Sequence, residues 1–228
     1  MAFQRLGLMM DCSRNAVMKK ETVKKWVDLL SQMGYNTLML YTEDTYEIKN
    51  QPYFGYLRGR YTQEELKDLD EYAAAHGMEL IPCIQTLAHL RTIFRWPEYA
   101  DVHDCHDILL VGEEKTYQLI DDMLRTCAEC FQSRTVNVGM DEAMFMGLGR
   151  YLQKNGYENR TDILLRHVKK VAEIAKKYGQ QLIMWGDMFF YLAERGYSVE
   201  DVQKEIPENV QLIYWDYNAT NLQHYRDK

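Results

Sequence analysis

One repeated unit constrains the fold of this chain more than any other feature. A helical segment ends at a glycine, an apolar strand follows, and polar residues come directly after the strand. The unit occurs at residues 33–40, 76–82 and 178–184. Strands that alternate with helices form a parallel sheet, and near-continuous apolar strands indicate that both faces of the sheet are covered.

Hydrophobic periodicity and helix-stop signals divide the whole chain into such units. Thr62 and Glu65 form a capping box, and Gly34, Gly77 and Gly179 follow the ends of helices. Residues 88–114 are predicted to be an irregular loop, and loops of that length are usually functional. The predicted strands are residues 3–10, 36–41, 78–84, 135–138, 181–185 and 210–215, and the predicted helices are residues 16–33, 62–76, 115–131 and 161–178.

These elements predict an α/β fold, a (β/α) TIM-type barrel that forms a single catalytic domain over residues 1–228. Its site would lie at the carboxyl ends of the strands. A doubly wound open sheet is the alternative, and no glycine-rich phosphate fingerprint opens a helix. Six strands are two short of a closed barrel, and only residues 216–228 follow Trp215. We therefore expect an incomplete barrel, truncated at its C-terminus, whose open edges pair with another copy, are covered by another polypeptide or leave a loosely packed monomer.

The net charge and the cysteine content indicate which partners and which cellular compartment to expect. A net charge of −7 argues against nucleic acid or an anionic membrane as a partner. No apolar run approaches the ~20 residues of a membrane span, and Asp11 interrupts the apolar start, unlike a signal peptide. The cysteine count of five is odd, and Cys127 and Cys130 lie within an amphipathic helix. We expect all five to be free thiols in a cytoplasmic protein.

Two adjacent carboxylates, Asp141 and Glu142, follow the strand at residues 135–138. Neighbouring strand residues point to opposite faces, so both side chains serve one site only if the strand gives way to a loop at Gly139. Carboxylates held close together do not both ionise easily, which raises the pKa of one of them, as a general acid near neutral pH requires. Such pairs are common on solvated helices, but the strand-end position favours catalysis.

Other strands also end in polar or aromatic residues that would surround one pocket. Indole rings stack on the C–H faces of a sugar, and carboxylates bind its hydroxyls. A metal site at His103, Cys105 and His106 is the competing interpretation, but no distant partner pair completes it, and we expect neither a metal nor a cofactor. The strand-end residues are Asp11, Arg14, Glu43, Asp44, His89, Trp185, Asp187, Trp215 and Asp216.

Four of these stretches resemble signatures of family 20 of the glycoside hydrolases, the β-N-acetylhexosaminidases, and in particular its compact bacterial subgroup. Residues 137–143, Asn-Val-Gly-Met-Asp-Glu-Ala, resemble the fourth-strand signature that ends in Gly-Asp-Glu. Residues 81–89 resemble the third-strand motif, in which histidine follows proline by seven residues. Residues 7–11 and 40–44 are similar to the first and second strands. The resemblance covers essentially the whole chain.

The resemblance implies exo-acting, retaining hydrolysis of terminal β-GlcNAc or GalNAc. Asp141 would hold the 2-acetamido group, whose oxygen attacks the anomeric carbon, and Glu142 would protonate the leaving oxygen and then activate water. The resemblance also implies that Glu43 and His89 support the pair. Asp11, Glu43, His89, Trp185 and Trp215 are the expected substrate-binding residues. GlcNAc and GalNAc are not distinguished.

The chain also departs from the family pattern. The first-strand arginine that grips sugar hydroxyls falls on Leu6, with Arg14 and Arg5 as the candidates to replace it. Met144 stands where a polar residue is expected. The tyrosine, tryptophan and acids that the family's last two strands supply have no counterpart here. A catalytically inert sugar-binding or assembly fragment of the same fold is therefore the main alternative, and a different carboxylate barrel hydrolase is a third.

Overall fold

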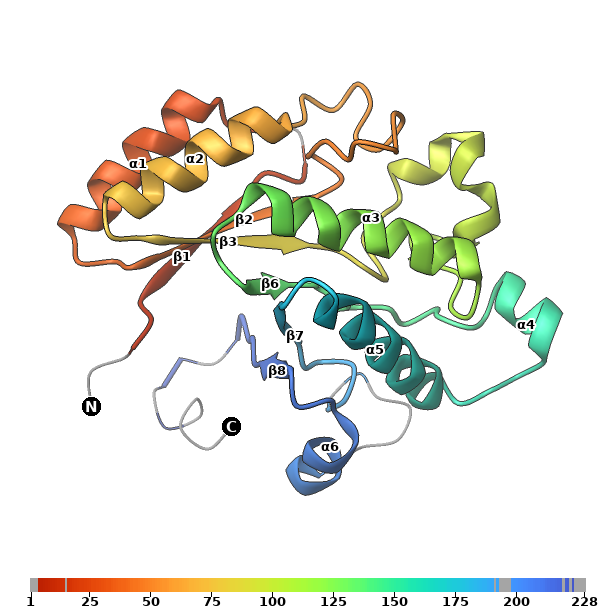
Figure 1. The fold of residues 1–228 in the computed structure, drawn as a ribbon. Helices are drawn as coiled ribbons and strands as arrows, with labels where there is room; N and C mark the ends of the chain where they lie inside the picture. Colours follow the sequence, from red (N-terminus) through yellow and green to blue (C-terminus); the bar gives the residue numbers. More distant parts are fainter. Residues whose placement is uncertain are drawn as a thin grey trace.

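A parallel sheet of six strands forms the centre of the structure (Figure 1). This computed structural model describes residues 4–14, 16–190, 192, 198–218, 220, 221 and 223. The strand order is β1-β2-β3-β6-β7-β8, and all neighbours in it are parallel. The strands are β1 (Gly7–Asp11), β2 (Thr37–Glu43), β3 (Glu79–Ile84), β6 (Thr135–Asn137), β7 (Gln181–Trp185) and β8 (Val210–Ile213).

The long helices lie side by side along one face of this sheet (Figure 1). A doubly wound sheet places helices on both faces and reverses its strand order, whereas this one keeps chain order throughout. The prediction of an incomplete (β/α) barrel is therefore confirmed. The helices are α1 (Lys20–Gln32), α2 (Gln63–Ala75), α3 (Glu114–Cys130), α4 (Arg150–Asn155), α5 (Arg160–Lys176) and α6 (Val199–Glu205).

The two faces of the sheet differ in burial. Side chains alternate along a strand, and in β2 the residues Leu38 and Leu40 are buried beneath the helices. Met39 and Tyr41, on the other face, are only partly buried. Met9, which is in register with Met39, is 43% exposed. The second face would line the interior of a closed barrel, and here it is open because β1 and β8 are the edges of the sheet.

Local signals set most of the helix boundaries. The capping box of Thr62 and Glu65 is present, and Gly34, Gly77 and Gly179 all have positive φ. The predicted helix at residues 16–33 is too long, because α1 begins only at Lys20. The Tyr61 hydroxyl donates a hydrogen bond to the Met18 carbonyl at 2.6 Å, which fixes the residues before α1 outside the helix.

The prediction that residues 88–114 are irregular is only partly correct. They contain two short 3-10 helices, η1 (Ile93–Arg95) and η2 (Pro97–Val102), and an antiparallel pair, β4 (His103–Cys105) and β5 (Ile108–Leu109). All five cysteines are free thiols. Within the described part of the chain, no helix has the length and apolar character that crossing a membrane requires.

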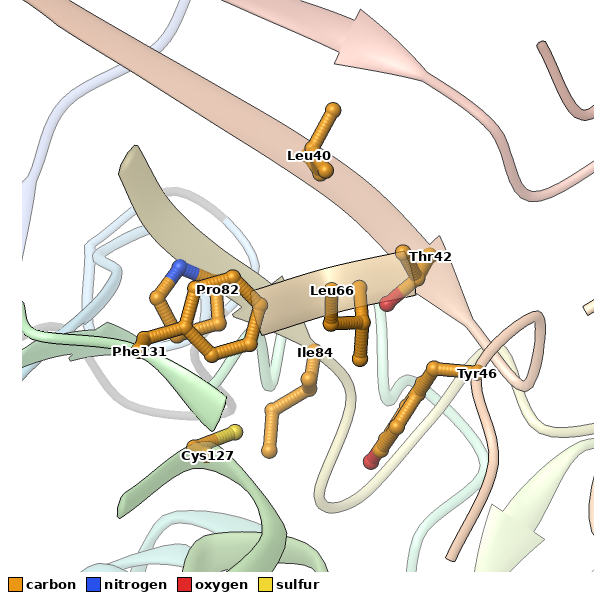
Figure 2. A pocket seen from close by; sticks show the side chains of 8 residues that line it. All are labelled: Leu40, Thr42, Tyr46, Leu66, Pro82, Ile84, Cys127 and Phe131. Atoms are coloured by element: carbon orange, nitrogen blue, oxygen red, sulfur yellow. The ribbon is translucent and has the colours of Figure 1, made fainter. Parts of the chain in front are cut away.

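Figure 2 shows a small cavity between the helix-facing side of the sheet and helices α2 and α3. The Tyr46 ring lies against its wall and packs edge-on against Phe54, with ring centroids 5.1 Å apart. The Tyr46 hydroxyl is buried and has no hydrogen-bond partner among the described residues. This cavity belongs to the core. Its lining consists of Leu40, Thr42, Tyr46, Leu66, Pro82, Ile84, Cys127 and Phe131.

Replacing Tyr46 with phenylalanine should stabilise the protein. A buried hydroxyl without a hydrogen-bond partner destabilises the folded state by on the order of 1 kcal/mol or more, and the substitution removes it. Tyr61→Phe is the matched control and should destabilise by about 1 kcal/mol, because the Tyr61 hydroxyl bonds to Met18. Urea unfolding measures both free energies. A loss of stability in Tyr46→Phe would show that the hydroxyl is satisfied, for example by water in the cavity.

Candidate active site

The loop after β6 brings Asp141 and Glu142 to one site. The strand ends at Asn137, whose Oδ1 accepts a hydrogen bond from the Gly139 N–H at 2.9 Å. Gly139, Met140 and Glu142 then have φ of 71°, 69° and 54°. This left-handed stretch breaks the alternation of a strand, as predicted for Gly139. Non-glycine residues hold such conformations only where the surroundings enforce them.

Gln85 enforces this conformation from the β3 side. Its side chain is fully buried just after the end of β3. Gln85 Oε1 accepts a hydrogen bond from the Met140 N–H at 3.1 Å. Gln85 Nε2 donates to Asp141 Oδ1 at 2.8 Å and to the Tyr41 hydroxyl at 3.1 Å. One amide thus fixes the backbone of the loop and the orientation of the Asp141 carboxylate.

Asp187 enforces the conformation from the β7 side. Its Oδ2 accepts a hydrogen bond from the Glu142 N–H at 2.9 Å, and its Oδ1 accepts one from Trp215 Nε1 at 3.3 Å. Burial raises the pKa of the Asp187 carboxyl to about 6, against the opposing effect of the Glu142 N–H. The backbone N–H of Trp185 also donates to the Gly139 carbonyl at 3.1 Å. The loop is therefore held between two strand ends.

His89 lies between the two carboxylates. Its Nε2 is 3.3 Å from Asp141 Oδ2 and 3.6 Å from Glu142 Oε2, without hydrogen-bond geometry to either. Burial lowers the pKa of His89, but Asp141, Glu43 and Asp107 outweigh burial, so the net shift is upward. The Asp141 side chain is 17% exposed and that of Glu142 is 49% exposed. The Glu142 carboxylate is therefore much more accessible to solvent than that of Asp141.

Glu43 forms the buried end of the same network. The Tyr41 hydroxyl donates to Glu43 Oε1 at 3.0 Å, and the same hydroxyl accepts from Gln85. Arg14 Nη1 lies 3.2 Å from Glu43 Oε1. Burial raises the pKa of Glu43 to about 7, against the opposing effect of Arg14. A continuous chain of hydrogen bonds thus joins Glu43 to Asp141.

The remaining predicted residues are placed unevenly. Trp185 and Trp215 are half-buried at the ends of neighbouring strands, and Trp215 joins the site through Asp187. Asp11 is exposed and turns back on its own chain, where its Oδ1 accepts hydrogen bonds from the Ser13 N–H and Oγ at 2.8 and 2.6 Å. The structure therefore does not join Asp11 directly to the carboxylate pair.

The two arginine candidates lie at opposite ends of the sheet. Arg5 lies 3.1 Å from Glu79 and 3.2 Å from Thr135, the first residues of β3 and β6. This is the amino end of the strands, far from the loops that form the site. Arg14 pairs with Glu43 at the carboxyl end. Of the two, only Arg14 is at the rim.

Sequence reasoning missed two residues that organise the site. Gln85 is the first polar residue after the third apolar strand, a position that could have identified it as a residue of the site. His167 gave no signal, since it lies within α5. His167 is fully buried, its Nε2 lies 2.9 Å from the Thr86 carbonyl, and burial lowers its pKa to about 4. Thr86 Oγ1 in turn donates to the Val138 carbonyl at 2.9 Å, which anchors the end of β6.

The segment behind the competing metal interpretation does not bring its side chains together. His103 stacks on Phe94 with centroids 4.0 Å apart, and His106 stacks on Phe145 at 4.5 Å. The Cys105 thiol donates to the Phe145 carbonyl at 3.2 Å. Across the residues that the structure describes, no three His, Cys, Asp or Glu side chains are grouped so as to hold a metal ion.

The arrangement suits chemistry on a sugar. A recessed, hydrogen-bonded carboxylate can orient a polar substituent, and an exposed carboxylate beside it can exchange protons with substrate and water. Two indole rings at the next strand ends offer faces for stacking. Positioned donors and acceptors of this kind act without reorganising at the moment of reaction.

Comparisons with known proteins agree with this chemistry. The model of the family described as glycosyl hydrolase family 20, catalytic domain, matches residues 3–228. Hexosaminidase D of Bos taurus is 26% identical over 215 residues, which covers 84% of this chain and 57% of the bovine protein. A β-hexosaminidase of Porphyromonas gingivalis is 23% identical over 224 residues, which covers 82% of this chain and 28% of that protein.

Solved structures share the fold. A β-N-acetylhexosaminidase from Bacteroides fragilis superimposes with a TM-score of 0.75 at 25% identity, covering 97% of this chain and 45% of that structure. A chitobiase from Flavobacterium johnsoniae gives a TM-score of 0.76 at 20% identity, covering 94% of this chain and 34% of that structure. The chain thus spans little more than half of the bovine relative and less of the others.

Gly139→Ala should be more destabilising than Gly77→Ala, although both glycines have φ of 71°. An added Cβ at Gly77 meets nothing within 4 Å, so only the left-handed backbone costs energy, about 1–2 kcal/mol. At Gly139 the Cβ would lie 2.0 Å from Gln85 Oε1, which adds about 1–3 kcal/mol. Equal losses of unfolding free energy would mean that Gln85 does not clamp the loop.

Glu43 should lower the stability of the protein as pH rises from about 4.5 to 7, the interval between its ordinary and folded pKa values, whereas His167, whose pKa is lowered to about 4, acts in the opposite direction. In that interval the folded state binds more protons at Glu43 than the unfolded state, so the contribution of Glu43 to the free energy of unfolding decreases. Glu43→Gln should therefore make the slope of stability against pH more positive, and Glu173→Gln, which removes an exposed carboxylate, should leave it unchanged. Urea titrations at several pH values measure the slopes, and an unchanged slope in Glu43→Gln contradicts the assignment.

Proposed function

Because this chain belongs to glycosyl hydrolase family 20, whose catalytic-domain model matches residues 3–228, we propose that it acts as an exo-β-N-acetylhexosaminidase. The substrate is a glycan that ends in β-GlcNAc or β-GalNAc, and residues 1–228 act as one catalytic domain. The observation that carries the proposal is the clamped loop in which Asp141 is oriented by Gln85 beside the exposed Glu142.

The difference in exposure supports the roles that we propose for the two acids. A group that orients the 2-acetamido substituent must be fixed, and Asp141 is recessed and bonded to Gln85. A group that serves first the glycosidic oxygen and then water must be accessible to both, and the Glu142 side chain is 49% exposed. Asp141 accepts the acetamido N–H and stabilises the positive charge that develops on the acetamido group.

The reaction then proceeds in two steps with net retention. The acetamido oxygen attacks the anomeric carbon as the glycosidic bond breaks, and Glu142 gives its proton to the leaving oxygen. In the second step Glu142 takes a proton from water, which attacks the anomeric carbon and reopens the oxazolinium ring. This substrate-assisted route needs no second carboxylate as nucleophile.

The surrounding residues tune this pair. The raised pKa of His89 favours its protonated form, which offsets the negative charge of the two acids beside it. Glu43 orients Tyr41 and through it Gln85. Trp185 and Trp215 pack against the sugar and its acetamido group. Asp11, which is exposed at the rim, binds substrate hydroxyls.

The proposal also covers the association, the compartment and the partners of the protein. The open edges β1 and β8 favour association with another copy of the chain, and five free thiols suit the cytoplasm. A net charge of −7 disfavours nucleic acid and anionic membranes as partners. The inert-fragment alternative is not favoured, because the acid pair is present and Gln85 and Asp187 hold its loop.

Glu142→Gln should lower hydrolysis of substrates with poor leaving groups by roughly 10²–10⁴-fold, because no proton donor remains. The natural full-length protein should cleave a chromogenic β-GlcNAc and leave the matching β-glucoside essentially intact, since glucose lacks the acetamido group. Asp141→Asn should reduce turnover of the N-acetylated substrate. Steady-state kinetics measures all three. Equal turnover of both sugars, or full activity in Glu142→Gln, would refute the proposal.

A further inference from the structure

A buried ion pair beside the site takes no part in the hydrogen-bond network described above. Asp44 follows Glu43 directly, and its side chain is 1% exposed. Arg58 Nε donates a hydrogen bond to Asp44 Oδ1 at 3.2 Å, and the Arg58 side chain is 13% exposed. Taking two charges out of water is costly, so the further bonds that each partner makes indicate what the pair holds in place.

Arg58 connects the loop after β2 to the loop after β1. Its Nη2 donates to the Ser13 carbonyl, in addition to the bond from Nε to Asp44. The guanidinium is planar and rigid, so one side chain binds both acceptors in a fixed geometry. Thr45 Oγ1 makes a second connection, because it donates to the Cys12 carbonyl at 2.9 Å. The carbonyls of two consecutive residues in the first loop are thus bound by side chains of the second.

This connection reaches Asp11, the residue that we propose to bind substrate hydroxyls. Ser13 is fully buried, and its N–H and Oγ both donate to Asp11 Oδ1, at 2.8 and 2.6 Å. The orientation of Ser13 therefore sets that of the Asp11 carboxylate, and Arg58 holds Ser13 through its carbonyl. A chain of hydrogen bonds thereby joins Asp11 to Asp44, the neighbour of Glu43.

Asp44 connects the same ion pair to the loop after β3. Thr92 Oγ1 donates to Asp44 Oδ2, and Thr92 follows His89 by three residues. One buried pair thus joins the loops after β1, β2 and β3. These loops position Asp11, Glu43 and His89, three of the expected substrate-binding residues.

The turn that carries Arg58 has a strained backbone. Leu57 has φ of 63° and is 77% exposed, although large side chains rarely adopt the left-handed region. A Cβ at Gly55 would lie 2.0 Å from the Asp44 carbonyl oxygen, so the turn packs directly against the backbone of the ion pair. Such strain persists only where surrounding contacts enforce it, and the bonds of Arg58 are contacts of that kind.

We propose that Arg58 is a positioning residue, which fixes Asp11 through Ser13 so that Asp11 and Glu43 bind the same sugar ring. Asp11 ends β1 and Glu43 ends β2, and these strands are parallel neighbours, so both residues reach the same rim. A carboxylate held in its binding orientation loses little entropy when it binds a hydroxyl. The inference rests on the proposed function and adds a residue that determines substrate affinity.

The test measures kcat and KM of the natural full-length protein with a chromogenic β-GlcNAc. Arg58→Ala should raise KM by about 10-fold, the value of one hydrogen bond to a charged group. It should change kcat by less than about threefold, because binding that is equal in the ground and transition states affects KM alone. A residue with a merely structural role would instead lower kcat at unchanged KM, since part of the protein would be unfolded.

Arg58→Lys separates charge from geometry. A lysine keeps the positive charge beside Asp44, but its single nitrogen does not replace two donors of a planar group. Arg58→Lys should therefore also raise KM, and it carries the test alone if Arg58→Ala does not fold. Thermal unfolding of each variant shows whether it does.

Arg60→Ala is the matched control. Arg60 lies in the same loop, but its hydrogen bonds go to the Pro52 and Phe54 carbonyls of that loop, so KM should stay as in the wild type. Asp11→Ala should raise KM by itself, and adding Arg58→Ala to it should raise KM little further, because both changes remove the same contact with substrate.

Three results would each overturn the inference while turnover by the wild type upholds the proposed function. They are an unchanged KM in Arg58→Ala, a wild-type KM in Arg58→Lys, and effects of Arg58→Ala and Asp11→Ala that multiply independently. A wild-type protein that does not cleave the chromogenic β-GlcNAc overturns the proposed function and the inference with it.

Discussion

The buried amide of Gln85 is the interaction on which the candidate site depends. Its oxygen binds the Met140 N–H, and its nitrogen binds both Asp141 and the Tyr41 hydroxyl. Its hydrogen bonds help to offset the cost of the left-handed conformations of Met140 and Glu142. Asp187 secures the other side of the loop through the Glu142 N–H. Hydrogen bonds from buried side chains thus hold both carboxylates at one site, whereas consecutive residues of a regular strand would point to opposite faces.

Burial also separates the roles of acidic groups of similar chemistry. Glu43 and Asp187 are withdrawn from water, and their raised pKa values follow from that withdrawal. Asp141 is recessed but bonded, and Glu142 reaches solvent. The proposed function uses such a gradient from buried to exposed acids, because it requires one group that holds the substrate and another that exchanges protons. The fold supplies it because successive parallel strands end at the same rim.

The sequence predicted the framework well, for identifiable physical reasons. Helix-ending glycines and apolar runs mark the βα units, and residues that follow parallel strands converge, so the positions of Asp141, Glu142, Glu43 and His89 at one rim could be foreseen. The hydrogen bonds of Gln85 and Asp187 could not, because a strand-end position does not reveal which partner the side chain meets. Asp11 has the same kind of position, yet bonds to Ser13. Strands β4 and β5 are too short for periodicity to register.

The proposed reaction uses the substrate's own acetamido oxygen as its nucleophile, and successive fluorination of the acetamido group tests this step. Each fluorine withdraws electrons and weakens the oxygen as a nucleophile while changing its size little. The measurement is kcat/KM for aryl β-glucosaminides that carry acetyl, monofluoroacetyl, difluoroacetyl and trifluoroacetyl amides. We predict a steep, monotonic fall of kcat/KM with fluorine number. A rate that stays level across the series would contradict it.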